Sequence, residues 1–290
     1  MSGPIQAALR WLTIGIVAVV ATVVEAGQER DHEGAIEARN FPDATSAGVP
    51  AGISLRQSGG LTVTTAGAMI EGLNIVGQVV INAPNVTLRN CKVTSNSFAV
   101  ILIKDEISGT LIKNCEIDGQ GAGGQGIAGQ GTFVANNIHD CADGIDVRGN
   151  HTRIQDNFIH SMRGTENSHF DGIQADGKIS DLIIEHNTVI NEFAQTSALM
   201  LDNYWGPIDN VRIENNLLIG GGYTVYLNEV GKGQPGGGPM TNVVFVNNVL
   251  GKGRWGYWDL RSQLGNRPTL SGNLDRVSGR LLPGQVRFAR

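Results

Sequence analysis

A six-residue pattern of apolar and polar positions recurs along most of this chain. Its template is an apolar residue, two variable residues, Asn or Cys, one variable residue and a second apolar residue. Successive copies begin 18 to 32 residues apart and 25 residues apart on average, a spacing typical of solenoid repeats. The clear copies begin at Leu88, Ile112, Phe133, Ile154, Ile184, Ile213 and Phe245, and weaker copies begin at Ile70 and Leu270.

The residues inside and between the copies favour short strands. β-branched residues, short alternation of apolar and polar positions and 40 glycines predict strands joined by tight turns, whereas the pattern lacks the 3.6-residue period of an amphipathic helix. Variable spacing is expected when loops of different length leave the turns of a regular coil. The sequence therefore predicts an all-β, single-domain parallel β-helix of about nine coils.

The Asn or Cys position of the template is expected to form a buried column. Equivalent residues of neighbouring coils lie about 4.8 Å apart in such a solenoid, so one side-chain amide can bond the next. Cys91 and Cys115 occupy this position in the first two clear copies and are interpreted as buried free thiols, with a disulfide between them as the alternative. The expected amide ladder consists of Asn136, Asn157, Asn187, Asn216 and Asn248.

From about Leu61 to Leu281, these repeats resemble those of the right-handed parallel β-helix superfamily of pectate-lyase-like proteins. The opening from Phe41 to Gly52, followed by Met69 to Ile75, is similar to a group of exported bacterial β-helix proteins of undefined activity. The wider superfamily contains polysaccharide lyases, hydrolases, epimerases and phage tailspikes. The resemblance implies right-handed coils and a carbohydrate-binding cleft, while the chemistry must be argued from the residues of the site.

The N-terminal segment has the pattern of a secretory signal peptide. Arg10 precedes an apolar run from Trp11 to Val24, and Ala26 supplies a small residue for cleavage. The run is shorter than the roughly 20 residues of a bilayer span, so we expect a secreted or periplasmic protein without a membrane span after signal removal, and an uncleaved anchor is the alternative. The predicted organisation is a signal peptide over 1–26, a linker over 27–40, an N-terminal cap over 41–60 and a parallel β-helix with a C-terminal cap over 61–290.

The charge balance narrows the expected partners. The formal net charge is −5, and no basic excess is present to attract nucleic acid or an anionic lipid surface. An acidic polysaccharide would need a local cluster of Arg and Lys or a bridging cation. We therefore expect a monomer that binds a polysaccharide, with no nucleic-acid partner.

A second short strand precedes each copy of the template from Gly126 onward. Alternation places its aliphatic residues inside the coil and the residues between them outside. The outside residues are expected to form a sugar-binding floor, and an ordinary solvated sheet face is the alternative. Those residues are Asp146, Gln174, Met200 and Tyr226, and the flanking aromatic residues, which either stack on sugar rings or pack, are Tyr204, Trp205, Tyr223 and Trp255.

A repeated Asp-Gly-Ile brings two carboxylates to equivalent places on adjacent coils. These are Asp143 and Asp171, which would lie about 4.8 Å apart and repel each other. Such a pair tends to hold a proton or to recruit a cation, so calcium is the cofactor that this pair would bind. The alternative is that Asp-Gly only forms the turn into each strand.

The long polar loop before Asp171 contains a candidate general base, His169. In a lyase it would remove the proton α to a uronic-acid carboxylate, while Tyr226 or Tyr204 returns a proton to the leaving glycosidic oxygen. The positive residues expected to neutralise the substrate carboxylate are Arg163, Lys178 and Arg261.

These residues favour a lyase or epimerase that acts on an acidic, uronic-acid polysaccharide. The alternatives are a glycoside hydrolase that uses Asp143, Asp146 and Asp171, and a non-catalytic polysaccharide-binding or surface protein. His139 and His160 are expected to stack on adjacent coils in a structural role. The candidate catalytic residues are His169, Asp171, Tyr226 and Arg163, the candidates for substrate binding are Asp146, Gln174, Tyr204, Trp205, Lys178 and Arg261, and those for calcium are Asp143 and Asp171.

Overall fold

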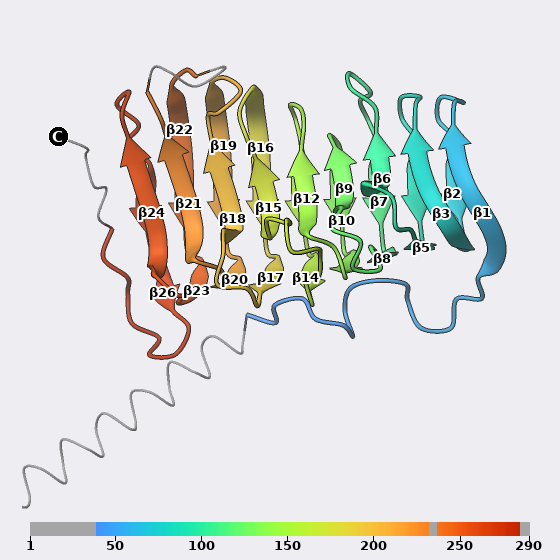
Figure 1. Ribbon diagram of the computed structural model, residues 1–290, viewed down its shortest axis with the longest axis horizontal. Coiled ribbons are helices and arrows are strands. Elements are labelled where there is room, and N and C mark those ends of the chain that lie inside the picture. Colours follow the sequence, from blue (N-terminus) through green and yellow to red (C-terminus); the bar gives the residue numbers. More distant parts are fainter. Residues whose placement is uncertain (1–38, 232–236, 285–290) are drawn as a thin grey trace, which may run out of the picture.

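The computed structural model describes residues 39–231 and 237–284 of the chain and has 26 strands (Figure 1). Over these residues there is no helix, and hence none of the length and apolar character that crossing a membrane requires. The predicted signal peptide and most of the predicted linker lie outside the described residues.

The chain winds repeatedly through three short strands. One of the three belongs to a nine-stranded sheet, which confirms the expected number of coils. Its strands pair in parallel, for example Ile154 with Ile184 and Ile184 with Ile213. The strands of this sheet are β2 (Met69–Glu71), β4 (Thr87–Arg89), β7 (Leu111–Lys113), β10 (Thr132–Val134), β13 (Arg153–Gln155), β16 (Ile179–Glu185), β19 (Ile208–Glu214), β22 (Met240–Val246) and β25 (Thr269–Ser271).

The other strands form a 17-stranded sheet made of two ladders. The short-strand ladder, which follows the Asn or Cys position, consists of β5 (Lys92–Thr94), β8 (Glu116–Asp118), β11 (Asn137–His139), β14 (Phe158–His160), β17 (Thr188–Asn191), β20 (Leu217–Gly220), β23 (Val249–Gly251) and β26 (Leu274–Asp275). The long-strand ladder consists of β1 (Arg56–Val63), β3 (Leu73–Ile81), β6 (Ala99–Ile103), β9 (Gln125–Gly129), β12 (Asp143–Val147), β15 (Asp171–Ala175), β18 (Ser197–Asp202), β21 (Tyr223–Glu229) and β24 (Gly256–Ser262). β3 pairs with both β5 and β6 and so joins the two ladders.

A sharp bend separates the nine-stranded sheet from the short-strand ladder. The residue at the bend has a φ of 52° at Asn90, 53° at Ala135 and 57° at Asn247. This left-handed backbone conformation favours Asn, Asp and Gly, which occupy most of the bends. The repeated geometry keeps the next side chain, the Asn or Cys of the template, pointing into the coil.

The predicted amide ladder is confirmed, and it is one residue longer than expected. In each step a side-chain nitrogen donates to the side-chain oxygen of the next coil at 2.9 to 3.1 Å. The oxygen also accepts a backbone N–H, at 3.0 Å from Asn136 N to Asn157 Oδ1. The last rung, Asn273, comes from the weak copy that begins at Leu270. These amides are buried and satisfy one another and the backbone where water is excluded.

The three cysteines are free and buried, which confirms the interpretation of Cys91 and Cys115 as core thiols. We expect none of the three thiols to react with a disulfide reagent in the native protein and all three to react after unfolding, because burial excludes the reagent. The coloured thiolate that the reagent releases measures the reaction. Rapid labelling of Cys91, Cys115 or Cys141 before unfolding would contradict the closed core.

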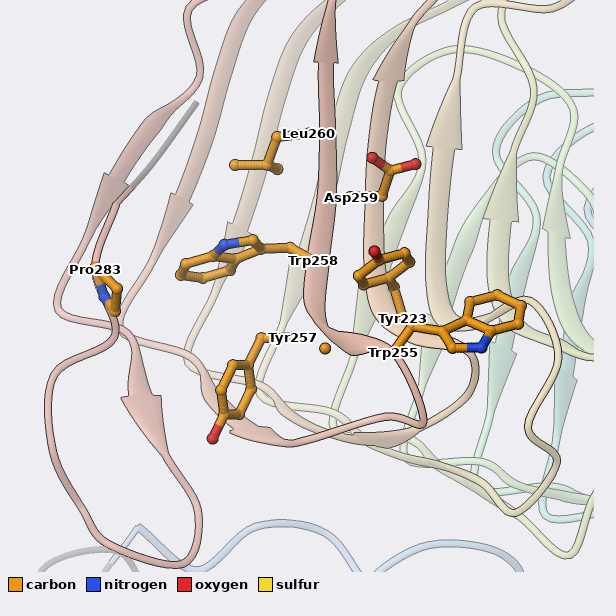
Figure 2. Close-up of a pocket in the computed structure, with 8 residues that line it drawn as sticks. Tyr223, Trp255, Tyr257, Trp258, Asp259, Leu260 and Pro283 are labelled. Carbon is orange, nitrogen blue, oxygen red and sulfur yellow. The ribbon is translucent and has the colours of Figure 1, made fainter. Parts of the chain in front are cut away.

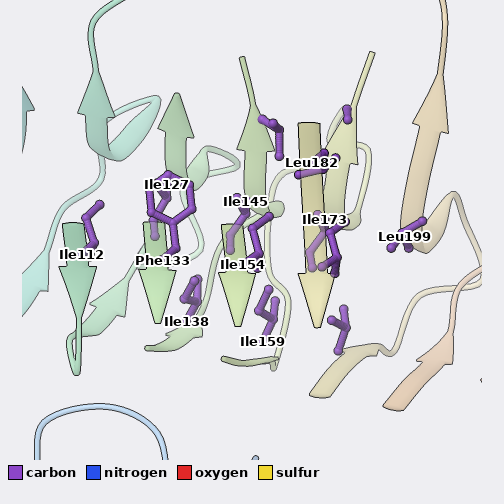
Figure 3. Packing of buried hydrophobic residues seen from close by; sticks show 14 of the residues in the cluster. Ile112, Ile127, Phe133, Ile138, Ile145, Ile154, Ile159, Ile173, Leu182 and Leu199 are labelled. Carbon is purple, nitrogen blue, oxygen red and sulfur yellow. The ribbon is translucent and has the colours of Figure 1, made fainter. Parts of the chain in front are cut away.

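The core consists of aliphatic and aromatic columns inside the coil (Figure 3). Phe133 pairs in register with Ile112 and Ile154, and all three side chains are fully buried. On the long-strand ladder, Ile145 pairs with Ile173. Each coil buries its apolar side chains against those of its neighbours, so the stack and not the single repeat provides the stabilising burial.

Residues 41–55, most of the predicted N-terminal cap, run along the outside of the coils before β1 begins (Figure 1). Phe41 stacks on His186 with ring centroids 5.8 Å apart, and Gly48 N donates to Ala135 O at 2.9 Å. β1 then pairs in parallel with β3. The segment thus passes along the middle coils, beside the bend between the nine-stranded sheet and the short-strand ladder, before it reaches the first coil.

Candidate functional site

The outer face of the long-strand ladder carries the predicted column of polar and aromatic residues. Asp146 pairs in register with Gln174, and Gln174 pairs with Met200. Met200 pairs with Tyr226, and the column continues to Asp259 of β24. In β12, β15, β18 and β21 the residues beside this column are buried in the core. The predicted outward alignment is therefore confirmed, and we call this surface the outer face.

Asp143 and Asp171 also lie on the outer face, at the start of β12 and β15. The glycine that follows each of them faces the core, where a Cβ at Gly172 would lie 2.1 Å from Val189 Cγ1. Neither glycine has a positive φ. Glycine is thus needed for close packing at the start of each strand, and neither glycine adopts a left-handed conformation. Because the glycine faces inward, the preceding carboxylate faces outward.

The two carboxyl groups form a coupled pair. Asp171 N donates to Asp143 Oδ1 at 3.2 Å, and Ser197 Oγ donates to Asp171 Oδ1 at 2.8 Å. Burial, reinforced by the charge of Asp143, raises the pKa of Asp171 to about 8. Burial, reinforced by the charges of Asp146 and Asp176, raises the pKa of Asp143 to about 7. The pair therefore holds a proton at neutral pH, and Asp143 is its more exposed member.

The side chain of Asp146 accepts hydrogen bonds from two neighbours on the outer face. Arg148 Nε donates to Asp146 Oδ2 at 2.6 Å, and Gln125 Nε2 donates to the same oxygen at 2.8 Å. Arg148 Nη2 also donates to Gln125 Oε1 at 2.8 Å, which closes the triangle. The Asp146 side chain is 12% exposed, so the carboxylate still reaches the surface of the cluster. Arg148 and Gln125 are not among the residues predicted from the sequence, although alternation from Asp146 places Arg148, two residues further on, on the same face.

A further outward column lies at the end of the same strands, and most of it was not predicted. Asp202 pairs in register with Asn228. Burial, reinforced by the charge of Asp202, raises the pKa of Asp176 to about 6, and burial also raises the pKa of Asp202. The sequence did contain a signal for this column, because each of its residues lies two positions after a residue of the first outward column and alternation therefore places it on the same face. In chain order, the column contains Arg148, Asp176, Asp202, Asn228 and Arg261.

Aromatic side chains lie at both edges of the outer face. Tyr204 and Trp205 follow β18 and form an edge-to-face pair, with ring centroids 4.8 Å apart and exposed fractions of 38% and 49%. Tyr204 N donates to Asp202 Oδ1 at 2.8 Å, which places this aromatic pair beside the column that contains Asp176, Asp202 and Asn228. At the other edge Tyr223 lies against Trp255, with ring centroids 5.8 Å apart. Figure 2 shows Tyr223 and Trp255 close together in the pocket beside β24.

Two predicted catalytic residues of the long loop stand apart from the hydrogen bonds of the outer face. His169 is exposed, and within the described residues it takes part in none of these bonds. Arg163 Nη1 forms an ion pair with Asp140 Oδ1 at 2.8 Å, at the bend after β11. Phe170, next to His169, stacks on Phe193 with ring centroids 3.8 Å apart. Participation of His169 and Arg163 in a reaction stays a prediction.

Lys178, Arg261 and the two histidines His139 and His160 lie on three different parts of the coil. Lys178 is exposed in the turn between β15 and β16. Arg261 Nη2 pairs with Asp259 Oδ2 at 2.9 Å on the outer face of β24. His139 and His160 pair in register on adjacent coils, as expected, with ring centroids 5.6 Å apart and ring planes tilted by 32°. Their structural role stays a prediction.

A calcium ion at the Asp143 and Asp171 pair stays a prediction. In the described part of the chain, one group of three His, Cys, Asp or Glu residues has ligand atoms within 4.8 Å of one another, and it consists of Asp118, His139 and Asp140. The two Asp140 oxygens there already bind His139 and Arg163 at 2.8 Å. The carboxyl groups of Asp143 and Asp171 would need further ligands from water or substrate to complete the coordination shell of a calcium ion.

Comparison with known proteins gives one result, which concerns the fold. A family model described as a right-handed beta helix region matches residues 51–165. A search of curated proteins and a search of solved structures each returned no match. Beyond the matched residues the same parallel pairing continues through β26. The family match and the unbroken stack of parallel coils together show that the chain folds as a right-handed parallel β-helix.

Proposed function

We propose that this chain is a carbohydrate-active protein that hydrolyses a glycosidic bond on the outer face. The observation that carries the proposal is the contrast between two neighbouring carboxyl sites. The pair of Asp143 and Asp171 retains a proton at neutral pH, whereas Asp146 is held by Arg148. Glycoside hydrolysis needs one protonated and one ionised carboxyl group flanking the scissile bond.

The proposed roles follow from exposure and charge. Asp143 donates its proton to the leaving glycosidic oxygen as the bond from that oxygen to the anomeric carbon breaks. Asp146 accepts a proton from the water whose oxygen forms the new bond to the anomeric carbon. Asp171 is 3% exposed, so it acts through Asp143 as a positioning residue. Gln174 and Tyr226, in the same column as Asp146, would bind sugar hydroxyls.

The charge of the outer face favours hydrolysis over the uronic-acid lyase that the sequence suggested. Both arginines of the outer face are already paired with carboxylates, Arg148 with Asp146 and Arg261 with Asp259. Four other carboxyl groups share the surface, and a uronic-acid polymer would add like charge to them. These four are Asp143, Asp171, Asp176 and Asp202.

Incubation with neutral, acidic and amine-bearing polysaccharides tests the proposal. We expect new reducing ends without the ultraviolet absorbance of an unsaturated uronide, and we expect them with or without a calcium chelator. Ultraviolet absorbance from an acidic polymer would support the lyase instead. Binding without any cleavage across the panel would assign the protein to the non-catalytic alternative.

A further inference from the structure

We propose that Asp176, Asp202 and Asn228 form a subsite for the ammonium group of an amine-bearing sugar, so that the glycan on the outer face is cationic. The inference rests on the proposed function, because the subsite belongs to the same face.

The three residues form one row across neighbouring coils. Ala175 pairs with Leu201, so Asp176 and Asp202, the next residues along the two strands, lie side by side. Asp202 pairs in register with Asn228. Adjacent strands are about 4.8 Å apart, so the row presents acceptor oxygens at the spacing of sheet strands. Such a row suits a group with several N–H donors, and an ammonium group has three of them.

Asn228 supplies an observation that points to a missing donor. The residue is 8% exposed, and its Oδ1 is buried without a hydrogen-bond partner. Buried acceptors without a partner are rare in folded proteins, and each one calls for an explanation. A ligand donor placed between Asn228 and Asp202 would satisfy the oxygen.

The two carboxylates also lack a cation. Among the described residues, no Lys, Arg or His forms an ion pair with Asp176 or Asp202, whereas the arginines at both ends of the column pair with Asp146 and Asp259. Asp176 Oδ2 accepts one hydrogen bond from Gln174 Nε2 at 2.5 Å. A ligand cation would relieve the repulsion between the two carboxylates.

The adjacent aromatic pair favours an amine on a sugar over a bare metal ion. Trp205 N donates to Asp176 O at 2.7 Å, and Tyr204 N donates to the Asp202 carboxylate. The half-exposed rings therefore border the acceptor row. An aromatic face can stack on a sugar ring and attract an ammonium group at once, whereas a calcium ion selects oxygen ligands only.

Calorimetric titration with a glucosamine hexasaccharide tests this subsite, and the N-acetylated hexasaccharide of the same linkage is the neutral control. The titration uses the full chain with Asp143→Asn as background, so that the ligand is not consumed. We expect the amine form to bind roughly tenfold or more tightly than the acetylated form and to weaken with added salt.

Four variants on that background locate the effect. Asp202→Asn and Asp176→Asn should each remove most of the preference for the amine while they leave binding of the acetylated form nearly unchanged. Trp205→Ala should weaken both ligands. Asp209→Asn is the matched control, because Asp209 is an exposed carboxylate of the nine-stranded sheet, and it should change neither affinity.

Three outcomes overturn the subsite. The first is equal affinity for the two hexasaccharides. The second is a preference for the amine that persists in both Asp202→Asn and Asp176→Asn. The third is that calcium alone binds at the row and that Asp202→Asn abolishes this calcium binding. The outcome for hydrolysis is read separately. Selective amine binding without cleavage by the wild-type chain keeps the subsite and rejects hydrolysis, whereas cleavage of a neutral glycan without an amine preference does the reverse.

Discussion

Replacing Asp143 with Asn is expected to lower glycan hydrolysis by about 10²-fold or more, because a general acid typically contributes 10² to 10⁴ to the rate. The substitution keeps the shape of the side chain and removes only the transferable proton. The amide can still accept the backbone N–H of Asp171, which Asp143 accepts now. Reducing ends released per minute measure the loss, and circular dichroism checks that the coils remain folded.

The pH dependence gives the same prediction a second readout. The wild-type rate should fall as the pH rises above about 7, because Asp143 must be protonated to act as the acid. The folded-state pKa of this group is raised. The stability that its proton contributes is therefore fully present below the unfolded-state pKa of roughly 4 and is lost as the pH rises through about 7. In Asp143→Asn the free energy of unfolding should decline less over this range.

Two further variants separate catalysis from general effects of charge. Asp105→Asn removes an exposed carboxylate in the turn after β6 and should leave the rate unchanged. His169→Ala should also leave hydrolysis nearly unchanged, because that side chain is exposed and outside the hydrogen bonds of the outer face. Full activity of Asp143→Asn, or loss of activity in His169→Ala alone, would refute the assignment of the acid and favour the histidine base of a lyase.

Replacing Asn187 with Ala is expected to destabilise the fold by on the order of 4 kcal/mol, because it leaves several buried polar groups unpaired. Asn187 Nδ2 donates to Asn216 Oδ1 and to Ile154 O, both at 2.9 Å. Its Oδ1 accepts the backbone and the side-chain N–H of Asn157, also at 2.9 Å. Denaturant unfolding followed by circular dichroism measures the change in the free energy of unfolding.

Cys115→Ala is the matched control for the ladder. Cys115 occupies the same column and is equally buried, but its thiol makes weak contacts, at 3.3 Å to Lys113 O, at 3.7 Å to Leu88 O and with the Cys91 thiol. Its removal should cost roughly 1 kcal/mol, mainly through lost packing. Equal destabilisation by the two substitutions would mean that the amide network contributes nothing beyond volume.

The coil, the columns of the core and the amide ladder could all be predicted from the repeat pattern of the sequence. These features follow from local rules, because each copy of the template repeats the same apolar positions and the same small polar residue at the bend. Once parallel coils are stacked, register follows from equivalence, and for this reason Asp146, Gln174, Met200 and Tyr226 could be aligned before any coordinates were known.

The grouping of side chains on the outer face depends on contacts between coils that are distant in sequence. Two successive residues face the core after Asp143 and after Asp171, and simple alternation does not predict this, because it depends on space left by side chains such as Val189 in another strand. The raised pKa values of this carboxylate pair likewise arise from burial and from charges on other coils. The pairing of Arg163 with Asp140 was also invisible, since it joins loops of different coils. The burial and the electrostatic environment of one side chain are set by neighbours that are distant in sequence. A local pattern of residues along the chain therefore does not predict them.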